Sequence, residues 1–208
     1  MRAFLSRIPL VKHLVPPIKP TAADAKDFWQ FMQQKYRTTV VDKNNAAEMK
    51  FVAEFLSLLG ILDKQAFLSQ YTTTVGSKIY VPHPIGVEAP GWDAWSQIVI
   101  CTHEHIHVMQ DKQAGGLAFE WAYVTSTAAR THYEVEAYRS GMELGWRYKR
   151  AMRVPAEIAA SLKNYACTPA DIQVAEKALA LAIPAIKAGA LTTEVTKAAA
   201  GWLDVRFA

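Results

Sequence analysis

The segment from Trp92 to Gln113 contains neither Gly nor Pro, and His103, His105 and His107 alternate within it. It is far longer than a typical strand of about 5–6 residues. A stripe at helical spacing runs along it and consists of Trp95, Ile98, Val99, Thr102, Ile106 and Met109. Asp93 is a favourable N-cap, and Gly115-Gly116 is a favourable helix end. The sequence therefore predicts one long helix here.

A strand is the alternative interpretation of the same segment. Ile98 to Thr102 is rich in β-branched residues, and on a strand the three histidines would share one face, as in metal sites of the His-x-His type. The length of the segment and its stripe favour the helix. On a helix, His105 points away from the face that His103 and His107 share.

The string His103-Glu104-His105-Ile106-His107 fits the pattern H-E-x-x-H. On a helix, both outer imidazoles can reach one ion, and Glu104 lies beside them as a candidate general base. A zinc ion held by two imidazoles needs a third protein ligand and an open position for water. Glu134 and Glu136, on a helix predicted from Ala128 to about Arg150, are candidates. They differ by about 200° around that helix, so both cannot face the same ion.

Together the two motifs resemble the gluzincin-type zinc metallopeptidases, and among them the minigluzincins, in which H-E-x-x-H is followed on a later helix by E-x-x-A-D. They are also similar to bacterial and phage domains that read H-E-x-x-H-x-x-Q and then E-x-E-A-Y, including the peptidase domain in core proteins of contractile injection systems. Here Gln110 follows the first motif, and residues 134–138 read E-V-E-A-Y. The likeness covers residues 79–138.

The resemblance implies a zinc site with His103, His107 and Glu134 as ligands, with Glu136 as the fallback third ligand. It also implies hydrolysis of a peptide or protein substrate with Glu104 as the base. The aspartate that follows in the family is replaced by Tyr138. Because Tyr138 lies one turn from Glu134, we expect that it could donate a hydrogen bond to a developing oxyanion.

The chain has 208 residues, 51% of them hydrophobic, which is enough for a single core. We expect a mainly α (α+β), zincin-like fold, with residues 1–20 as an N-terminal arm and residues 21–208 as one domain with a helical C-terminal extension. Further helices are predicted at 22–37, from Asn44 or Asn45 to Gly60, after Asp63, at 117–124, 156–165 and 170–188, and from Thr192 or Thr193 to Trp202.

A β-hairpin is predicted just before the metal-binding helix. Residues 71–75 and 78–81 have strand character and are joined by Gly76-Ser77, which is typical of a type II′ turn. We expect Ile79 to Val81 to form an exposed edge, ended by Pro82, along which an extended peptide could bind as an added strand.

Composition limits the partners and the location. The net charge of +4 comes without any Lys/Arg run, so the sequence gives no clear sign of nucleic-acid binding. We expect no signal peptide and no transmembrane segment, and hence a cytoplasmic or virion- or assembly-associated protein.

Two other functions stay open. One is a self-associating structural protein of a phage particle or secretion-type assembly. Its zinc site would be stabilising, with His83, His132 or Glu136 as the fourth protein ligand. The other is a zinc hydrolase that acts on something other than peptides.

Overall fold

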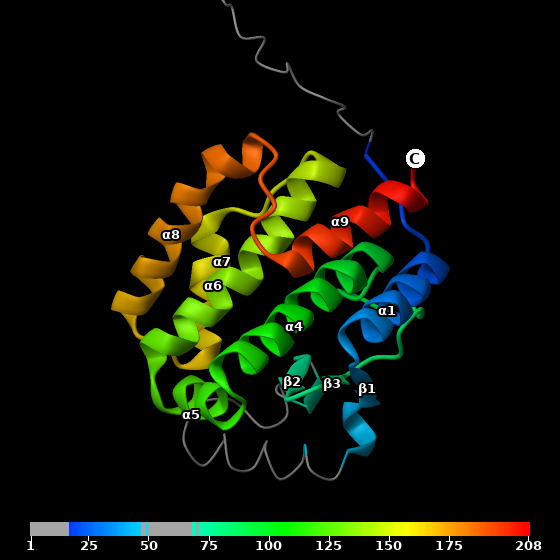
Figure 1. Ribbon diagram of the computed structural model, residues 1–208. Helices are drawn as coiled ribbons and strands as arrows, with labels where there is room; N and C mark the ends of the chain where they lie inside the picture. Colours follow the sequence, from blue (N-terminus) through cyan, green and yellow to red (C-terminus); the bar gives the residue numbers. More distant parts are fainter. Residues whose placement is uncertain (1–16, 47–48, 50–67, 70) are drawn as a thin grey trace, which may run out of the picture.

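The structure, a computed structural model, describes residues 17–46, 49, 68–69 and 71–208 (Figure 1). Most of the predicted N-terminal arm lies outside the described residues, as do most of the helix predicted from Asn44 or Asn45 to Gly60 and the start of the one after Asp63. The rest is mainly helical with one small sheet, which confirms the predicted mainly α (α+β) class.

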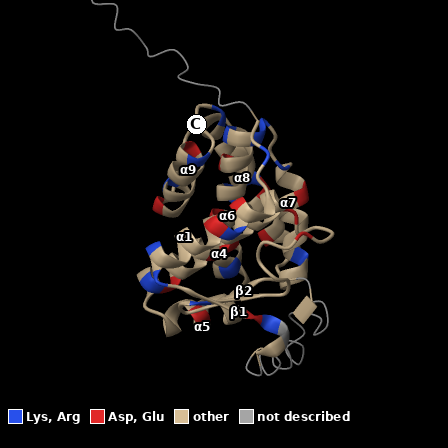
Figure 2. Ribbon diagram, turned by 90° about the vertical axis from the view of Figure 1, so that its right-hand side faces the viewer, with Lys and Arg blue, Asp and Glu red and all other residues tan. Residues whose placement is uncertain are grey.

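The described α-helices are α1 (Ala22–Tyr36), α4 (Ala94–Ala114), α5 (Leu117–Thr125), α6 (Thr127–Leu144), α7 (Pro155–Ser161), α8 (Pro169–Lys187) and α9 (Glu194–Arg206). Short 3-10 helices lie at Lys43–Asn45 and Leu162–Tyr165, and a π-helical turn at Gly145–Lys149 extends α6. In Figure 2, Lys and Arg residues are interspersed with Asp and Glu residues along these elements. Within the described part of the chain, no helix is both long enough and apolar enough to cross a membrane.

Helix α4 is the central element, and it confirms the predicted helix and rules out the strand interpretation. The side chain of Asp93 accepts a hydrogen bond from the backbone N–H of Ser96, and the helix ends at Gly115, whose φ of 87° favours glycine. In Figure 1, α1 and α9 lie on one side of α4 and α6 lies on the other. The main hydrophobic core forms around it, because Ile98, Cys101 and Ile106 are buried against residues of α1 and α9.

The sheet has three strands, in the order β1 (Thr39–Asp42), β3 (Lys78–Val81) and β2 (Thr73–Val75). The predicted hairpin is confirmed: β2 and β3 are antiparallel, and Val75 pairs with Lys78 across the two-residue turn. Gly76 has a φ of 57° while Ser77 does not have a positive φ, as a type II′ turn requires.

The predicted edge of the sheet is wrong. We expected Ile79 to Val81 to be exposed, but β1 pairs with β3 in parallel, with Val40 opposite Ile79, so β3 is the central strand and is largely buried. Among the described strands, the two edges of the sheet belong to β1 and β2. Sequence reasoning missed β1, although Thr39, Val40 and Val41 are β-branched residues of the kind that favours strands.

The C-terminal helices pack as a layer on α6. Helix α8 lies against α6 and α7, with Met142, Ile158 and Leu179 at the shared core. Pro184 lies inside α8 and does not end it, and α9 runs four residues beyond its expected end at Trp202, to Arg206. The described end of the N-terminal arm packs against the rest of the chain. Ile18 is buried, and its N–H donates to the carbonyl of Tyr148 over 3.0 Å.

Candidate metal centre

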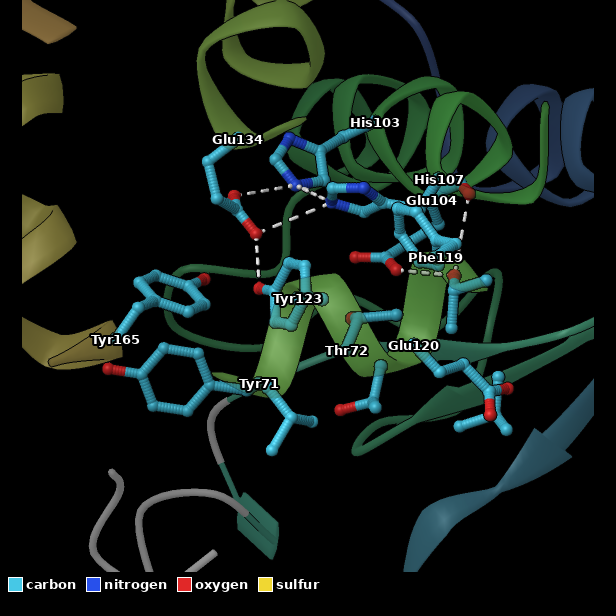
Figure 3. A pocket seen from close by; sticks show the side chains of 14 residues that line it. Tyr71, Thr72, His103, Glu104, His107, Phe119, Glu120, Tyr123, Glu134 and Tyr165 are labelled. Carbon is cyan, nitrogen blue, oxygen red and sulfur yellow. Dashed lines mark hydrogen bonds and ion pairs between the residues drawn. The ribbon is translucent and has the colours of Figure 1, made fainter. Parts of the chain in front are cut away.

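Three side chains from two helices converge on one point (Figure 3). His103 and His107 come from α4 and Glu134 from α6, and one ligand atom of each lies within 4.8 Å of the others. Oε2 of Glu134 lies 3.4 Å from Nε2 of His103, and Oε1 lies 3.5 Å from Nε2 of His107. The two Nε2 atoms are 3.1 Å apart. This arrangement can hold a metal ion, as the two motifs predict.

Close packing of α4 on α6 brings the ligands together. Along α6, Ala137 and Gly141 follow Glu134 at three and seven residues, and so lie on the face that meets α4. A Cβ atom at Gly141 would lie only 3.0 Å from Cγ1 of Val99 on α4. The small residues therefore permit an approach close enough for Glu134 to reach both histidines.

One buried oxygen atom of the cluster lacks a hydrogen-bond partner within the described part of the chain. Glu134 is only 1% exposed, yet its Oε2 atom has no hydrogen-bond partner among the described residues. Leaving such an atom buried and unsatisfied is costly. A cation between the two imidazoles and the carboxylate would satisfy it, so the donor set fits a metal ion.

Gln110 orients His107. Its Nε2 atom donates to the carbonyl of Tyr133 over 3.1 Å and to Oε2 of Glu136 over 2.7 Å, and both of these partners can only accept. Its Oε1 atom, 2.8 Å from Nδ1 of His107, must then accept a hydrogen bond from Nδ1–H. The lone pair of Nε2 is thereby turned toward the cluster, as a metal-binding histidine requires.

The charges of the cluster depend on each other. Burial lowers the pKa of His107, but the neighbouring Glu134 carboxylate raises it by more, so that the pKa of His107 is raised to about 9. Burial would likewise raise the pKa of Glu134, but His107 and His103 hold it well below its usual range. Without a metal ion, the site therefore holds a proton on imidazole beside an ionised carboxylate, and a cation would replace that proton.

Glu104 lies beside the ligands and is held by the edge strand. Oγ1 of Thr74, in β2, donates to Oε2 of Glu104 over 2.7 Å. The start of β2 is fixed in turn by Lys43, which is fully buried and donates to the carbonyl of Tyr71 and to Oγ1 of Thr73. Burial lowers the pKa of Lys43 to about 7, although the charge of Glu104 opposes this.

A cavity of about 290 Å³ opens beside the cluster. One wall is the segment from Tyr71 to Val75, and the other is formed by α5 through Phe119, Glu120, Tyr123 and Val124. His103, Glu104, His107 and Glu134 line it between these walls, and Tyr165 lines it as well. The cluster, the candidate base and the β2 edge of the sheet therefore share one space.

Two tyrosines at this site were missed by sequence reasoning. The hydroxyl of Tyr123 donates to Oε1 of Glu134 over 2.6 Å, and Tyr165 reaches the cavity from the 3-10 helix after α7. Tyr138 packs edge-on against the ring of His103, and its hydroxyl lies 3.5 Å from that of Tyr165. Of Tyr138 and Tyr165, only Tyr165 is among the described residues that line the cavity. A tyrosine in a predicted helix resembles a core residue, so the sequence held no signal that Tyr123 or Tyr165 belongs to the site.

Arg130 holds the aromatic wall of the cavity. Its buried guanidinium donates to the carbonyls of Tyr123 and Val124, each over 2.8 Å, and also to the carbonyl of Tyr165. These bonds join the end of α5 and the 3-10 helix to α6, one turn before Glu134. Carbonyl groups at a helix end need such donors.

The other predicted candidates lie elsewhere. Glu136 accepts from Gln110 and does not face the histidines, so Glu134 is the glutamate in the cluster. His105 points away as expected, with Nε2 2.9 Å from Oγ1 of Thr38. His83 packs against Trp92, and His132 is exposed. Among the described residues, the cluster has no fourth histidine, cysteine or carboxylate ligand.

Comparisons of the chain with protein-family models, with curated proteins and with solved structures found no match.

Proposed function

We propose that the chain is a zinc-dependent metallopeptidase in which His103, His107 and Glu134 hold the metal. The observation that carries the proposal is the open side of the cluster. Among the described residues no fourth side chain closes it, and the cavity, Glu104 and a free strand edge meet there. A structural zinc site would have four protein ligands, whereas a catalytic one leaves a position for water or substrate. A zinc ion held there would supply Lewis acidity, which lowers the pKa of water and polarises a carbonyl group.

Glu104 is the proposed general base. Of the described residues, only Thr74 donates to its carboxylate, and that bond engages Oε2. Oε1 can then accept a proton from the attacking water and return it to the nitrogen of the leaving amine.

Strand β2 is the proposed binding edge for the substrate backbone. Among the described residues it pairs with β3 alone, and it forms one wall of the cavity that the three ligands also line. A peptide added to such an edge gains backbone hydrogen bonds whatever its sequence. Tyr165 is our candidate donor to the developing oxyanion, because in Figure 3 its hydroxyl is turned toward the cluster.

The test combines two measurements on the purified chain. Elemental analysis should find about one zinc ion per chain, and a mixed peptide library analysed by mass spectrometry should show cleavage that stops when a chelator is added and resumes with zinc. Zinc without any cleavage would contradict the peptidase.

A second candidate is a structural component of a phage or secretion-type assembly with a stabilising metal site. Large apolar side chains on the outer helices favour it, since Val174 and Leu181 of α8 and Val205 of α9 are exposed. Such residues can be buried when subunits assemble. Under this proposal the zinc ion raises thermal stability, and Glu104 has no effect of its own.

A further inference from the structure

Glu120 is a carboxylate in the cavity to which the proposed mechanism gives no role. It lies on α5, is partly buried and lines the same space as Glu104 and Glu134. Within the described part of the chain its carboxylate makes no hydrogen bond or ion pair, whereas the carboxylate of Glu104 accepts from Thr74 and that of Glu134 from Tyr123. It is therefore free to meet a ligand that enters the cavity.

The charge of the cavity leaves Glu120 uncompensated. The described residues that line the space include three carboxylates and neither Lys nor Arg. A divalent cation bound by Glu134, with Glu104 beside it, offsets those two negative charges. Glu120 then retains one negative charge in a space walled largely by apolar and aromatic side chains, where a charge acts more strongly than it does in water.

The two ends of the cavity differ in chemistry. In Figure 3, Tyr71 and Tyr165 lie at one end and Glu120 at the other, with the two histidines between them. The rings of Tyr71 and Tyr165 meet edge to face at 5.6 Å, which makes that end aromatic. A peptide that crosses the metal site therefore presents residues on the two sides of its reacting bond to two unlike surfaces.

We propose that Glu120 is a specificity-determining residue that selects substrates with a lysine or arginine side chain on one side of the scissile bond. The aromatic end then takes a large apolar side chain on the other side. This inference rests on the proposed peptidase function and names its substrate class. An ion pair that is partly shielded from water gives such a preference, and a tenfold preference corresponds to about 1.4 kcal/mol.

The experiment uses the full-length, zinc-loaded chain and pairs of fluorogenic peptides. Members of a pair differ only by Lys or Gln at the residue before the cleaved bond, or in a second set at the residue after it. In one of the two sets, we expect kcat/KM to be about tenfold higher for the Lys peptide. Glu120→Gln should bring this ratio close to one, and Glu120→Lys should invert it. Glu176→Gln, which removes an exposed carboxylate on α8, is the matched control and should keep the ratio.

A binding measurement separates this inference from the proposed function. Anisotropy of the same labelled peptides is measured on zinc-loaded Glu104→Gln, with and without Glu120→Gln, so that no turnover is needed. Cleavage without a charge preference, or a preference that survives Glu120→Gln, overturns the role of Glu120 and leaves the peptidase standing. If no peptide is cleaved, a preference for the Lys peptide in binding that needs Glu120 supports the inference, and equal or absent binding overturns it.

Discussion

The amide oxygen of Gln110 lies 2.8 Å from Nδ1 of His107, and this contact decides which ring nitrogen faces Glu134. The amide of Gln110 is held by Tyr133 and Glu136 on α6. One glutamine on α4 thus links the orientation of a metal-binding ring to the neighbouring helix.

Gln110→Ala should weaken zinc binding without removing a ligand. Loss of the acceptor at Nδ1 frees the ring to rotate and to change tautomer, and partners of this kind typically contribute 10–100-fold in metal affinity. Competition with a chromogenic chelator would measure the change. Gln113→Ala, on the same helix but exposed, is the control. Equal affinities for the two variants would contradict the role of Gln110.

Glu134→Gln should abolish stoichiometric zinc binding, whereas Glu136→Gln should retain it. Glu134 lies 3.4 Å and 3.5 Å from the two imidazole nitrogens, while Glu136 contacts Gln110. Metal content measured after gel filtration compares the two isosteric changes directly. If only Glu136→Gln lost its zinc, a different arrangement of α6 in solution would be indicated.

Glu104→Gln separates an enzyme from a protein with a stabilising metal site. The substitution preserves shape but removes the base, so we expect proteolysis to fall by roughly 10²-fold or more. Zinc content and melting temperature should hardly change, because Thr74 can still bond the amide. Activity equal to that of the parent chain would exclude Glu104 as the base.

The stability of the metal-free protein should depend on the protonation of His107. Its pKa is raised from an ordinary value of 6.5 to about 9 in the folded chain, so this contribution is complete below pH 6.5 and disappears as the pH rises through about 9. The melting temperature of the chelator-treated chain should therefore fall across that window. His107→Gln should flatten this part of the profile. Zinc-loaded protein should not show the fall, since metal binding displaces the proton.

Arg130→Ala should lower the free energy of unfolding, because Arg130 holds the wall of the cavity together. It removes the donor to three backbone carbonyls, at Tyr123, Val124 and Tyr165, and each buried group left unsatisfied costs about 1–3 kcal/mol. Allowing for entry of water, we expect a loss of about 3 kcal/mol in chemical denaturation. Lys177→Ala, at an exposed site on α8, should change stability by less than about 0.5 kcal/mol.

Local sequence signals predicted the α-helices that the structure describes, the hairpin, and the two clustered histidines His103 and His107. Asp93 and Gly115 mark the ends of α4, and Gly76-Ser77 marks the turn. Capping residues, turn residues and hydrophobic periodicity act over a few neighbouring residues, so they can be recognised in the sequence alone. The family resemblance then selected Glu134 as the third ligand, and the position of the Glu134 carboxylate beside His103 and His107 agrees with that choice.

Contacts between distant segments could not be predicted in this way. The pairing of β1 with β3 joins Val40 to Ile79, and nothing in either segment specifies the other. The same holds for Tyr165, which reaches the cavity from the 3-10 helix after α7, where Arg130 of α6 donates to its carbonyl. Lys43 is another case, since a lysine in a polar segment is expected at the surface, yet here it is buried beneath β2.

The missing side chain at Gly141 bears on which ions the protein can accept. Metals differ in bond length, from about 2.0 Å for nitrogen on zinc to about 2.3–2.6 Å for oxygen on calcium. Because a Cβ there would meet Val99 at 3.0 Å, an alanine would push α6 away from α4 by a few tenths of an ångström, which is the same scale. Gly141→Ala should therefore shift preference from zinc toward larger ions. The separation of two helix backbones, fixed about two turns away from Glu134, would then select the ionic radius.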